Sequence, residues 1–507
     1  MSSRFFSAAV VGVDAFEVQI EANAGWGRDG QISIVGLPDT AIKESRDRVT
    51  SAIMNSALRW PPGKLTINLA PADLRKEGPA FDLPIALATA GAVERNRIPD
   101  LNDYSIAGEL ALSGQVRPIK GALAIALEAK RCGRSRLIVP AANAREAAIV
   151  GGVQVYGASG LAEVVAFLRG DHMLVPAEPA PFTRPEYESD FSEVRGQFHV
   201  RRAVEIAAAG AHNLLMIGPP GSGKSMIAKR IPTILPPLAL NEAIETTKIH
   251  SVCGLLASGQ EFMTERPFRS PHHTISDVGL LGGSGHPMPG EVSLAHHGVL
   301  FLDEFPEFRR STLEVMRQPL EDGRVTISRA AGTMTFPSEF MLIAAMNPCP
   351  CGHYGDPNRD CRCTWPQIAK YRSRISGPLL DRIDIHIEVP AIELPELTNT
   401  AEGEPSAVMR KRVGQARWRQ LKRFAGESRV RSNARMTPRL LKQHCALDSD
   451  SQQIIRQAVT ELHLSARAYD RVLKVARTIA DLAGAERIQS EHLAEAVQYR
   501  TLDRSLW

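Results

Sequence analysis

The sequence predicts a multidomain α/β protein with a helical C-terminal part. Its 507 residues suggest about three domains at roughly 150 residues each. Short apolar runs alternate with helical stretches in the first two thirds, and beyond about residue 405 the spacing is helical only. We therefore expect an α/β domain over 1–170, a linker over 171–190, a second α/β domain over 191–395 and a helical domain over 396–507.

The composition is typical of a soluble globular protein, with 44% hydrophobic and 23% charged residues. The longest apolar run, 83–93, is too short to span a bilayer, and Asp14 and Glu17 interrupt the N-terminal run that a signal peptide would need. Four of seven cysteines crowd into 349–363, unlike a disulfide framework. We expect a cytoplasmic protein without membrane contact, whose net charge of +4 permits nucleic-acid binding.

Local patterns predict individual elements. In the first domain they indicate strands at 7–13, 32–35 and 64–69 and helices at 41–57 and 119–132. In the second they indicate strands at 213–217, 298–302 and 340–345, apolar on both faces as in a parallel sheet. The C-terminal helices are expected at 450–463, 467–482 and 490–499. The linker carries four prolines between residues 173 and 187.

A phosphate-binding motif, G-x-x-x-x-G-K-S, follows the strand at 213–217 and opens a helix. Its backbone N–H groups and the helix N-terminus would hold phosphates, Lys224 would reach the β and γ oxygens, and Ser225 would ligate Mg²⁺. The candidate ATP-binding residues are Gly218, Pro219, Pro220, Gly221, Ser222, Gly223, Lys224 and Ser225. Because the motif lies between a strand and a helix, a glycine-rich loop that matches it by chance is disfavoured.

Polar residues follow the next two apolar strands. Asp303 would hold Mg²⁺ directly or through water, and Glu304 would polarise the attacking water. Asn347 would act as the sensor that orients this water. The alternatives are a solvated strand end for the acidic pair and a turn residue before Pro348 for the asparagine.

Two arginines complete the predicted catalytic set. Arg382, in a Leu-Leu-Asp-Arg-Ile-Asp segment, has the context of an arginine finger, and Arg467 that of a second sensor. Either could neutralise charge on the γ-phosphate across a subunit interface. The alternative for each is a surface ion pair.

Several longer motifs carry a family resemblance. They are RSPHHTIS (269–276), PGEVSLAHHG (289–298), NPCPCG (347–352), IVGLPD (34–39) and ESRDR (44–48). With them, essentially the whole chain resembles the ComM/YifB family of magnesium-chelatase-like AAA+ proteins. The resemblance implies a Lon-protease-like (ribosomal protein S5 domain 2-like) N-terminal domain, an AAA+ core of the helix-2-insert type and a helical lid. It also implies a hexameric, ATP-hydrolysing DNA helicase that moves branched DNA when incoming strands recombine during natural transformation (competence).

The resemblance further implies two insertions facing the pore of a ring, at 272–296 and 324–336. The second alternates like a β-hairpin, with Ala331-Gly332 as its turn. Arg324 and Arg329 could there contact single-stranded or branched DNA. An ordinary hairpin with solvated arginines is the alternative.

The first domain lacks the protease dyad of the Lon family that it resembles. Ala80 follows Lys76-Glu-Gly-Pro79 where that family has its serine, and Leu123 takes the place of its lysine. Without a nucleophile and its amine base, acyl transfer cannot begin. We expect no proteolysis.

Two further clusters have alternatives. A structural Zn²⁺ could be enclosed by four cysteines in the pattern C-x-C-x₉-C-x-C, which are Cys349, Cys351, Cys361 and Cys363, with His353 as a substitute ligand. The alternatives are reduced buried thiols or a redox pair. The basic stretch 410–435 could contact DNA or form a solvated helix over apolar surface. For the whole chain, a chelatase-type or protein-remodelling ATPase and a non-hydrolysing ATP switch remain alternative functions.

Overall fold

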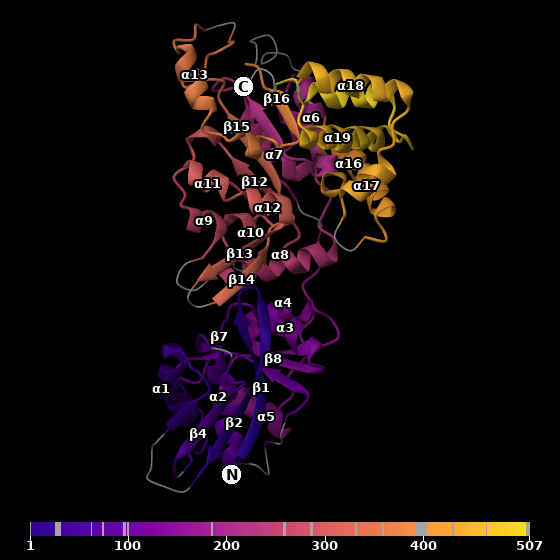
Figure 1. Cartoon of the computed structure of the whole chain (residues 1–507). Helices are drawn as coiled ribbons and strands as arrows, with labels where there is room; N and C mark the ends of the chain where they lie inside the picture. Colours follow the sequence, from indigo (N-terminus) through magenta and orange to yellow (C-terminus); the bar gives the residue numbers. More distant parts are fainter. Residues whose placement is uncertain are drawn as a thin grey trace. The chain divides into compact units, whose positions relative to one another are not determined.

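The computed structural model describes residues 2–502 except 26–31, 62, 74–75, 95–97, 99–100, 184–185, 257–259, 284–286, 330–331, 357–358, 392–402, 428–429 and 463. The chain forms two compact units (Figure 1). The first unit comprises Met1–Thr183 and Ala239–Thr264, and the second comprises Arg184–Leu238 and Glu265–Trp507. Both mix helices and strands, which confirms the predicted α/β class.

The first unit is built on two larger sheets. One has the order β1-β2-β4-β3, with β1 and β2 as a long antiparallel hairpin, and the other is the parallel sheet β5-β8-β9. The strands are β1 (Ser2–Val11), β2 (Asp14–Ala24), β3 (Ile32–Val35), β4 (Leu65–Ala70), β5 (Tyr104–Ile106), β6 (Glu109–Leu110), β7 (Val116–Arg117), β8 (Arg136–Pro140) and β9 (Gln154–Ala158). The helices are α1 (Thr40–Asn55), α2 (Asp82–Val93), α3 (Ala122–Arg131), α4 (Ala144–Ala148), α5 (Leu161–Arg169) and α8 (Leu240–Cys253).

Helix α8 belongs to the first unit although it follows the phosphate-binding motif in the sequence. The side chain of Ser251 accepts a 3.1 Å hydrogen bond from the backbone N–H of Gly121 and donates to the carboxyl group of Glu146. Burial raises the pKa of Glu146, and the Ser251 hydroxyl acts in the opposite direction. The prediction of one domain over 191–395 included 239–264, because the local patterns do not indicate that this segment packs on the N-terminal part.

The second unit contains a five-stranded parallel sheet of order β11-β12-β15-β10-β16. The strands are β10 (Leu214–Ile217), β11 (Phe268–Arg269), β12 (Val299–Leu302), β15 (Met341–Met346) and β16 (Ile385–Glu388). Every residue of β10, β12 and β15 is buried, as the continuous apolar runs predict. Because the strands are parallel, their carboxyl ends lie at one edge of the sheet.

Helices surround this sheet, and in Figure 1 the C-terminal ones, in yellow, lie beside α6. The helices before the C-terminal part are α6 (Phe198–Gly210), α7 (Lys224–Ile234), α9 (Asp277–Leu281), α10 (Glu291–Leu294), α11 (Arg310–Glu314), α12 (Arg317–Asp322), α13 (Trp365–Arg372) and α14 (Gly377–Leu380). Those that follow are α16 (Ser406–Arg423), α17 (Pro438–His444), α18 (Ser449–Leu462), α19 (Ala466–Ala483) and α20 (Ser490–Gln498).

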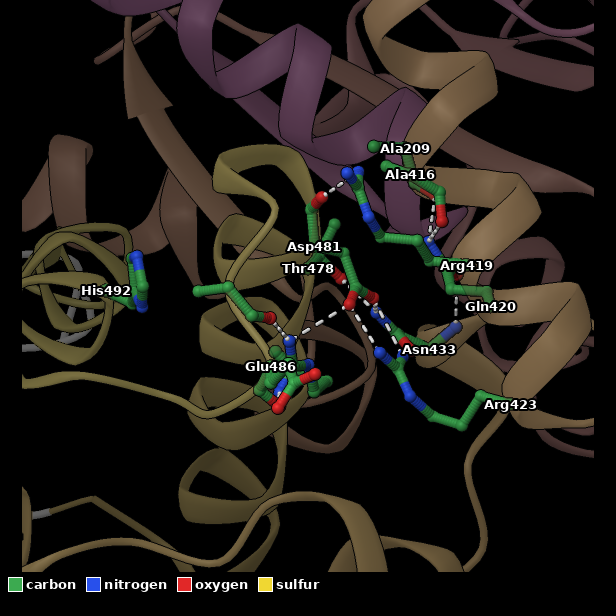
Figure 2. Close-up of polar contacts among 12 residues, drawn as sticks. Ala209, Ala416, Arg419, Gln420, Arg423, Asn433, Thr478, Asp481, Glu486 and His492 are labelled. Atoms are coloured by element: carbon green, nitrogen blue, oxygen red, sulfur yellow. Dashed lines mark hydrogen bonds and ion pairs between the residues drawn. The ribbon is translucent and has the colours of Figure 1, made fainter.

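A buried polar network joins the C-terminal helices α16 and α19 (Figure 2). Asp481 of α19 accepts 2.8 Å hydrogen bonds from Nη1 of Arg423 and Nδ2 of Asn433. The Asn433 amide also donates to Oγ1 of Thr478 at 3.1 Å, and this oxygen lies 2.8 Å from Nε2 of His212. His212 lies just before β10, so the network reaches the strand that leads into the phosphate-binding motif.

Most arginines of the basic helix α16 serve this packing. Arg412 pairs with Glu205 and Glu404, and Arg417 donates to the carbonyl oxygen of Ala208 at 3.0 Å. These contacts favour the structural interpretation of the basic stretch over DNA contact. Among the described residues, none of the helices combines the length and apolarity needed to cross a membrane.

Candidate nucleotide-binding site

The phosphate-binding motif forms a loop between β10 and α7, as predicted. Helix α7 begins at Lys224, directly after Gly223, and both Gly221 and Gly223 have a positive φ, of 79° and 87°. At Gly218 a Cβ would lie 2.1 Å from the carbonyl oxygen of Val389, so only glycine fits there. The loop therefore has the shape that lets backbone N–H groups surround an anion.

Lys224 is buried at the centre of the loop. Its Nζ donates to the carbonyl oxygens of Gly218 at 2.7 Å and Pro219 at 2.8 Å. Burial lowers the pKa of Lys224 to about 8, and the negative charge of Asp303 opposes this shift. A bound phosphate would supply the negative charge that a buried ammonium group requires.

Ser225 and Asp303 meet at the position expected for Mg²⁺. The Ser225 hydroxyl donates a 2.6 Å hydrogen bond to Oδ2 of Asp303, which follows the last residue of β12. A hydroxyl and a carboxylate oxygen are ligands that Mg²⁺ prefers, and the ion commonly uses one or two such groups with phosphate oxygens. The donor set therefore fits Mg²⁺ bound together with a nucleotide.

Glu304 adopts a left-handed backbone conformation (φ 52°), with its N–H bonded to Oδ1 of Asp303 at 2.9 Å. Its side chain is 57% exposed, and Oε2 lies 3.0 Å from Nδ1 of His273. In the sequence, His273 stood out only as part of a family motif, and its contact with Glu304 was not predicted. The histidine pair in that motif was the available signal.

Asn347 completes the group at the carboxyl edge of the sheet. It follows β15, and its Oδ1 lies 3.4 Å from Nζ of Lys224. The ends of β10, β12 and β15 thus bring together side chains that are widely separated in sequence.

The two predicted arginines lie elsewhere in this unit. Arg382 precedes β16, which is parallel to β10, so it lies at the amino edge of the sheet, opposite the phosphate-binding loop. It is only 4% exposed and pairs with Glu321. Burial lowers the pKa of Arg382, and the positive charges of Arg317 and Arg467 lower it further. Arg467, exposed at the start of α19, is therefore close to Arg382 and not part of the loop site.

The hairpin predicted at 324–336 is present as β13 (Arg324–Arg329) and β14 (Gly332–Pro337). Gly332, predicted as part of the turn, instead belongs to the second strand and pairs with Arg329, whereas Ala331 lies outside the described residues. Arg324 and Arg329 are both exposed, one at the base of the hairpin and the other at its tip.

The four clustered cysteines come together as free thiols. The Sγ atoms of Cys349, Cys351, Cys361 and Cys363 all lie within 4.8 Å of one another. His353 is not part of this cluster, and its Nδ1 lies 3.2 Å from Oδ2 of Asp356.

Comparison with known proteins gives matches along the whole chain. The family described as subunit ChlI of Mg-chelatase matches residues 18–143. The family described as magnesium chelatase, subunit ChlI, matches 190–397, and the family of that subunit's C-terminal part matches 403–500. "Uncharacterized protein YifB" of Salmonella typhimurium is 46% identical over 98% of this chain and 97% of the relative. "Competence protein ComM" of Haemophilus influenzae is 44% identical over 99% and 98%. "Lon protease 2" of Bacillus subtilis is 29% identical over 30% of this chain and 28% of its own length.

Proposed function

The chain belongs to the ComM/YifB family of magnesium-chelatase-like proteins, and we propose that it is an AAA+ ATP hydrolase that moves DNA. The hydrolase assignment rests on the polar side chains that meet at one edge of the parallel sheet, those of Lys224, Ser225, Asp303 and Asn347. Mg²⁺ bound with ATP would neutralise charge on the phosphate oxygens.

Each residue of the site has a separate role in the proposed hydrolysis. Lys224 exchanges its bonds to loop carbonyls for the β and γ oxygens, while Ser225 and Asp303 hold the metal. Glu304, exposed and adjacent to them, accepts a proton from the attacking water, and Asn347 orients that water. His273 holds the Glu304 carboxylate in place until substrate arrives.

Arg382 and Arg467 act on the site of a neighbouring subunit in a ring. Strand β10, between their edge of the sheet and the phosphate-binding loop, is roughly 13 Å long, so Arg382 cannot reach the γ-phosphate of its own chain without rearrangement. In a head-to-tail ring each subunit offers one edge to the next. Arg382 would then exchange Glu321 for the neighbour's phosphate. The family resemblance supports six subunits in this proposed ring.

DNA is the proposed substrate of the motor. The hairpin carries two exposed arginines and two cross-strand hydroxyl pairs, Thr326 with Thr335 at 3.0 Å and Ser328 with Thr333 at 2.9 Å. Arginine and hydroxyl side chains are the usual partners of phosphate oxygens in protein–DNA contacts. The relative named as a competence protein supports a role in recombination of incoming DNA during natural transformation.

ATP hydrolysis measured with and without branched DNA tests this proposal. DNA should stimulate the wild-type rate, and the stimulation should weaken as salt rises because phosphate contacts release counterions. Glu304→Gln should bind ATP but hydrolyse it about a hundredfold or more slowly. Absence of wild-type hydrolysis would refute the ATPase assignment and favour a nucleotide switch.

A chelatase-type or protein-remodelling ATPase is the second candidate, because all three family matches carry the chelatase description. Hydrolysis that ignores DNA at every salt concentration but responds to a porphyrin and a partner protein would favour it.

A further inference from the structure

The loop that carries the four cysteines lies against the phosphate-binding loop. Gly352, between Cys351 and His353, has a φ of 86°, and a Cβ built on it would lie 2.6 Å from Cδ of Pro220. The same loop begins at Asn347, two residues before Cys349, and is called the sensor loop below. Anything that fixes the cysteines therefore also fixes Asn347 and the surface that faces Pro220.

Three of the four sulfurs lie at separations close to those of a tetrahedral zinc site, and the fourth, of Cys363, lies within 4.8 Å of each of them. Sγ of Cys349 lies 3.3 Å from that of Cys351 and 3.7 Å from that of Cys361, and the last two are 3.6 Å apart. Zinc–sulfur bonds of about 2.3 Å in a tetrahedron place the sulfurs about 3.8 Å apart. The backbone N–H of Tyr354 donates to Sγ of Cys349 at 3.3 Å, a contact of the kind that orients metal-bound thiolates.

We infer that the four cysteines bind one structural Zn²⁺ and that this ion couples the sensor loop to the phosphate-binding loop. Zinc binding displaces the thiol protons and cross-links Cys349 and Cys351 to Cys361 and Cys363. This cross-link would fix the segment that contains Gly352, which faces Pro220, and would hold Asn347 at the end of β15. The metal site stands on the sulfur geometry alone, whereas its effect on hydrolysis rests on the proposed ATPase function.

Metal analysis of the full-length chain, purified under reducing conditions, tests the site. About one zinc per chain is expected, and Co²⁺ in its place should give the intense visible absorption of a tetrahedral thiolate complex. Cys361→Ser/Cys363→Ser should lose the metal, while Cys132→Ser, a thiol outside the cluster, should retain it. A wild type that takes up neither ion, or a double variant that retains zinc, would overturn the inference.

Two glycines provide a matched test of the coupling. Gly352 and Gly355 both have positive φ, 86° and 79°, but only at Gly352 would a Cβ meet another residue within 4 Å. Gly352→Ala should keep its zinc yet lower kcat by about ten- to a hundredfold, because a small misplacement of the sensor loop suffices; Gly355→Ala should change kcat much less. Equal effects would overturn the coupling. If the wild type hydrolyses no ATP, the metal content of the wild type and the cysteine variants still tests the zinc site. The nucleotide affinities of Gly352→Ala and Gly355→Ala then test the coupling.

Discussion

The hydroxyl of Ser225 donates a 2.6 Å hydrogen bond to Oδ2 of Asp303, joining the start of α7 to the end of β12. In the proposed nucleotide-bound state, Ser225 and Asp303 would hold Mg²⁺, directly or through its water, in place of this contact. The two residues thus lie ready for the metal before it binds.

Replacing Asp303 should weaken the magnesium site selectively. Asp303→Asn should raise the Mg²⁺ concentration needed for half-maximal hydrolysis by about ten- to a hundredfold, since it removes the carboxylate charge. Titration of ATPase rate against Mg²⁺ measures this. The control is Asp322→Asn, at the exposed end of α12. Equal magnesium requirements in Asp303→Asn and the wild type would contradict the assignment.

Lys224 should give nucleotide binding a distinctive pH dependence. Its pKa is about 8 in the nucleotide-free protein, and phosphate charge raises it, so above pH 8 binding must take up a proton. The affinity for ATP should therefore fall as pH rises through 8, by up to about tenfold per pH unit. Lys224→Arg, whose side chain stays charged, should bind more weakly but show no such fall. Titration of a fluorescent nucleotide between pH 7 and 9.5 distinguishes the two.

The proposed action of Arg382 across an interface predicts complementation. Arg382→Ala and Glu304→Gln should each be nearly inactive alone. In a 1:1 mixed ring about a quarter of the interfaces combine an intact loop site with an intact arginine, so the mixture should recover ATPase activity. Arg467→Ala should complement in the same way. A mixture no more active than its components, although mixed rings form, would place these arginines outside the catalytic site.

The hairpin arginines should contribute to DNA affinity without affecting ATP binding. Arg324→Ala/Arg329→Ala should weaken binding to single-stranded DNA and lower the slope of log affinity against log salt by about 2. Arg309→Ala/Arg310→Ala removes two other exposed arginines and serves as the control. The prediction fails if both double variants have the wild-type slope in fluorescence anisotropy titrations.

The buried network of Figure 2 should matter for stability more than for chemistry. Asp481→Asn removes the negative partner of Arg423 and Arg477 in a fully buried environment. Breaking such a pair costs about 3–5 kcal/mol, so the second unit should unfold at a markedly lower temperature. Thermal unfolding followed by circular dichroism, with Asp322→Asn as the exposed control, tests this. Equal melting temperatures would show that the network adds no net stability.

The sequence predicted the elements whose signals are local. The strand before Gly218, the strand before Asp303 and the hairpin after Gly323 all lie where periodicity places them, because each depends on burial of adjacent residues. The Lys224–Asn347 approach was predictable from parallel strand ends and the motif.

Other features depend on contacts between distant segments. The packing of α8 on the first unit depends on Ser251 meeting Glu146, and nothing near either residue indicates the other. The burial of Arg382 against Glu321 and the approach of Gly352 to Pro220 are likewise set by tertiary packing. Periodicity carries no information on such pairings, so the sequence alone could not predict them.

A strand-displacement assay shows whether ATP hydrolysis drives movement on DNA. A three-stranded branched DNA with one labelled strand is incubated with the wild type or Glu304→Gln, with ATP or a non-hydrolysable analogue. We expect the labelled strand to be released only by the wild type and only with ATP. Robust ATP hydrolysis by the wild type without release of the strand would contradict this expectation.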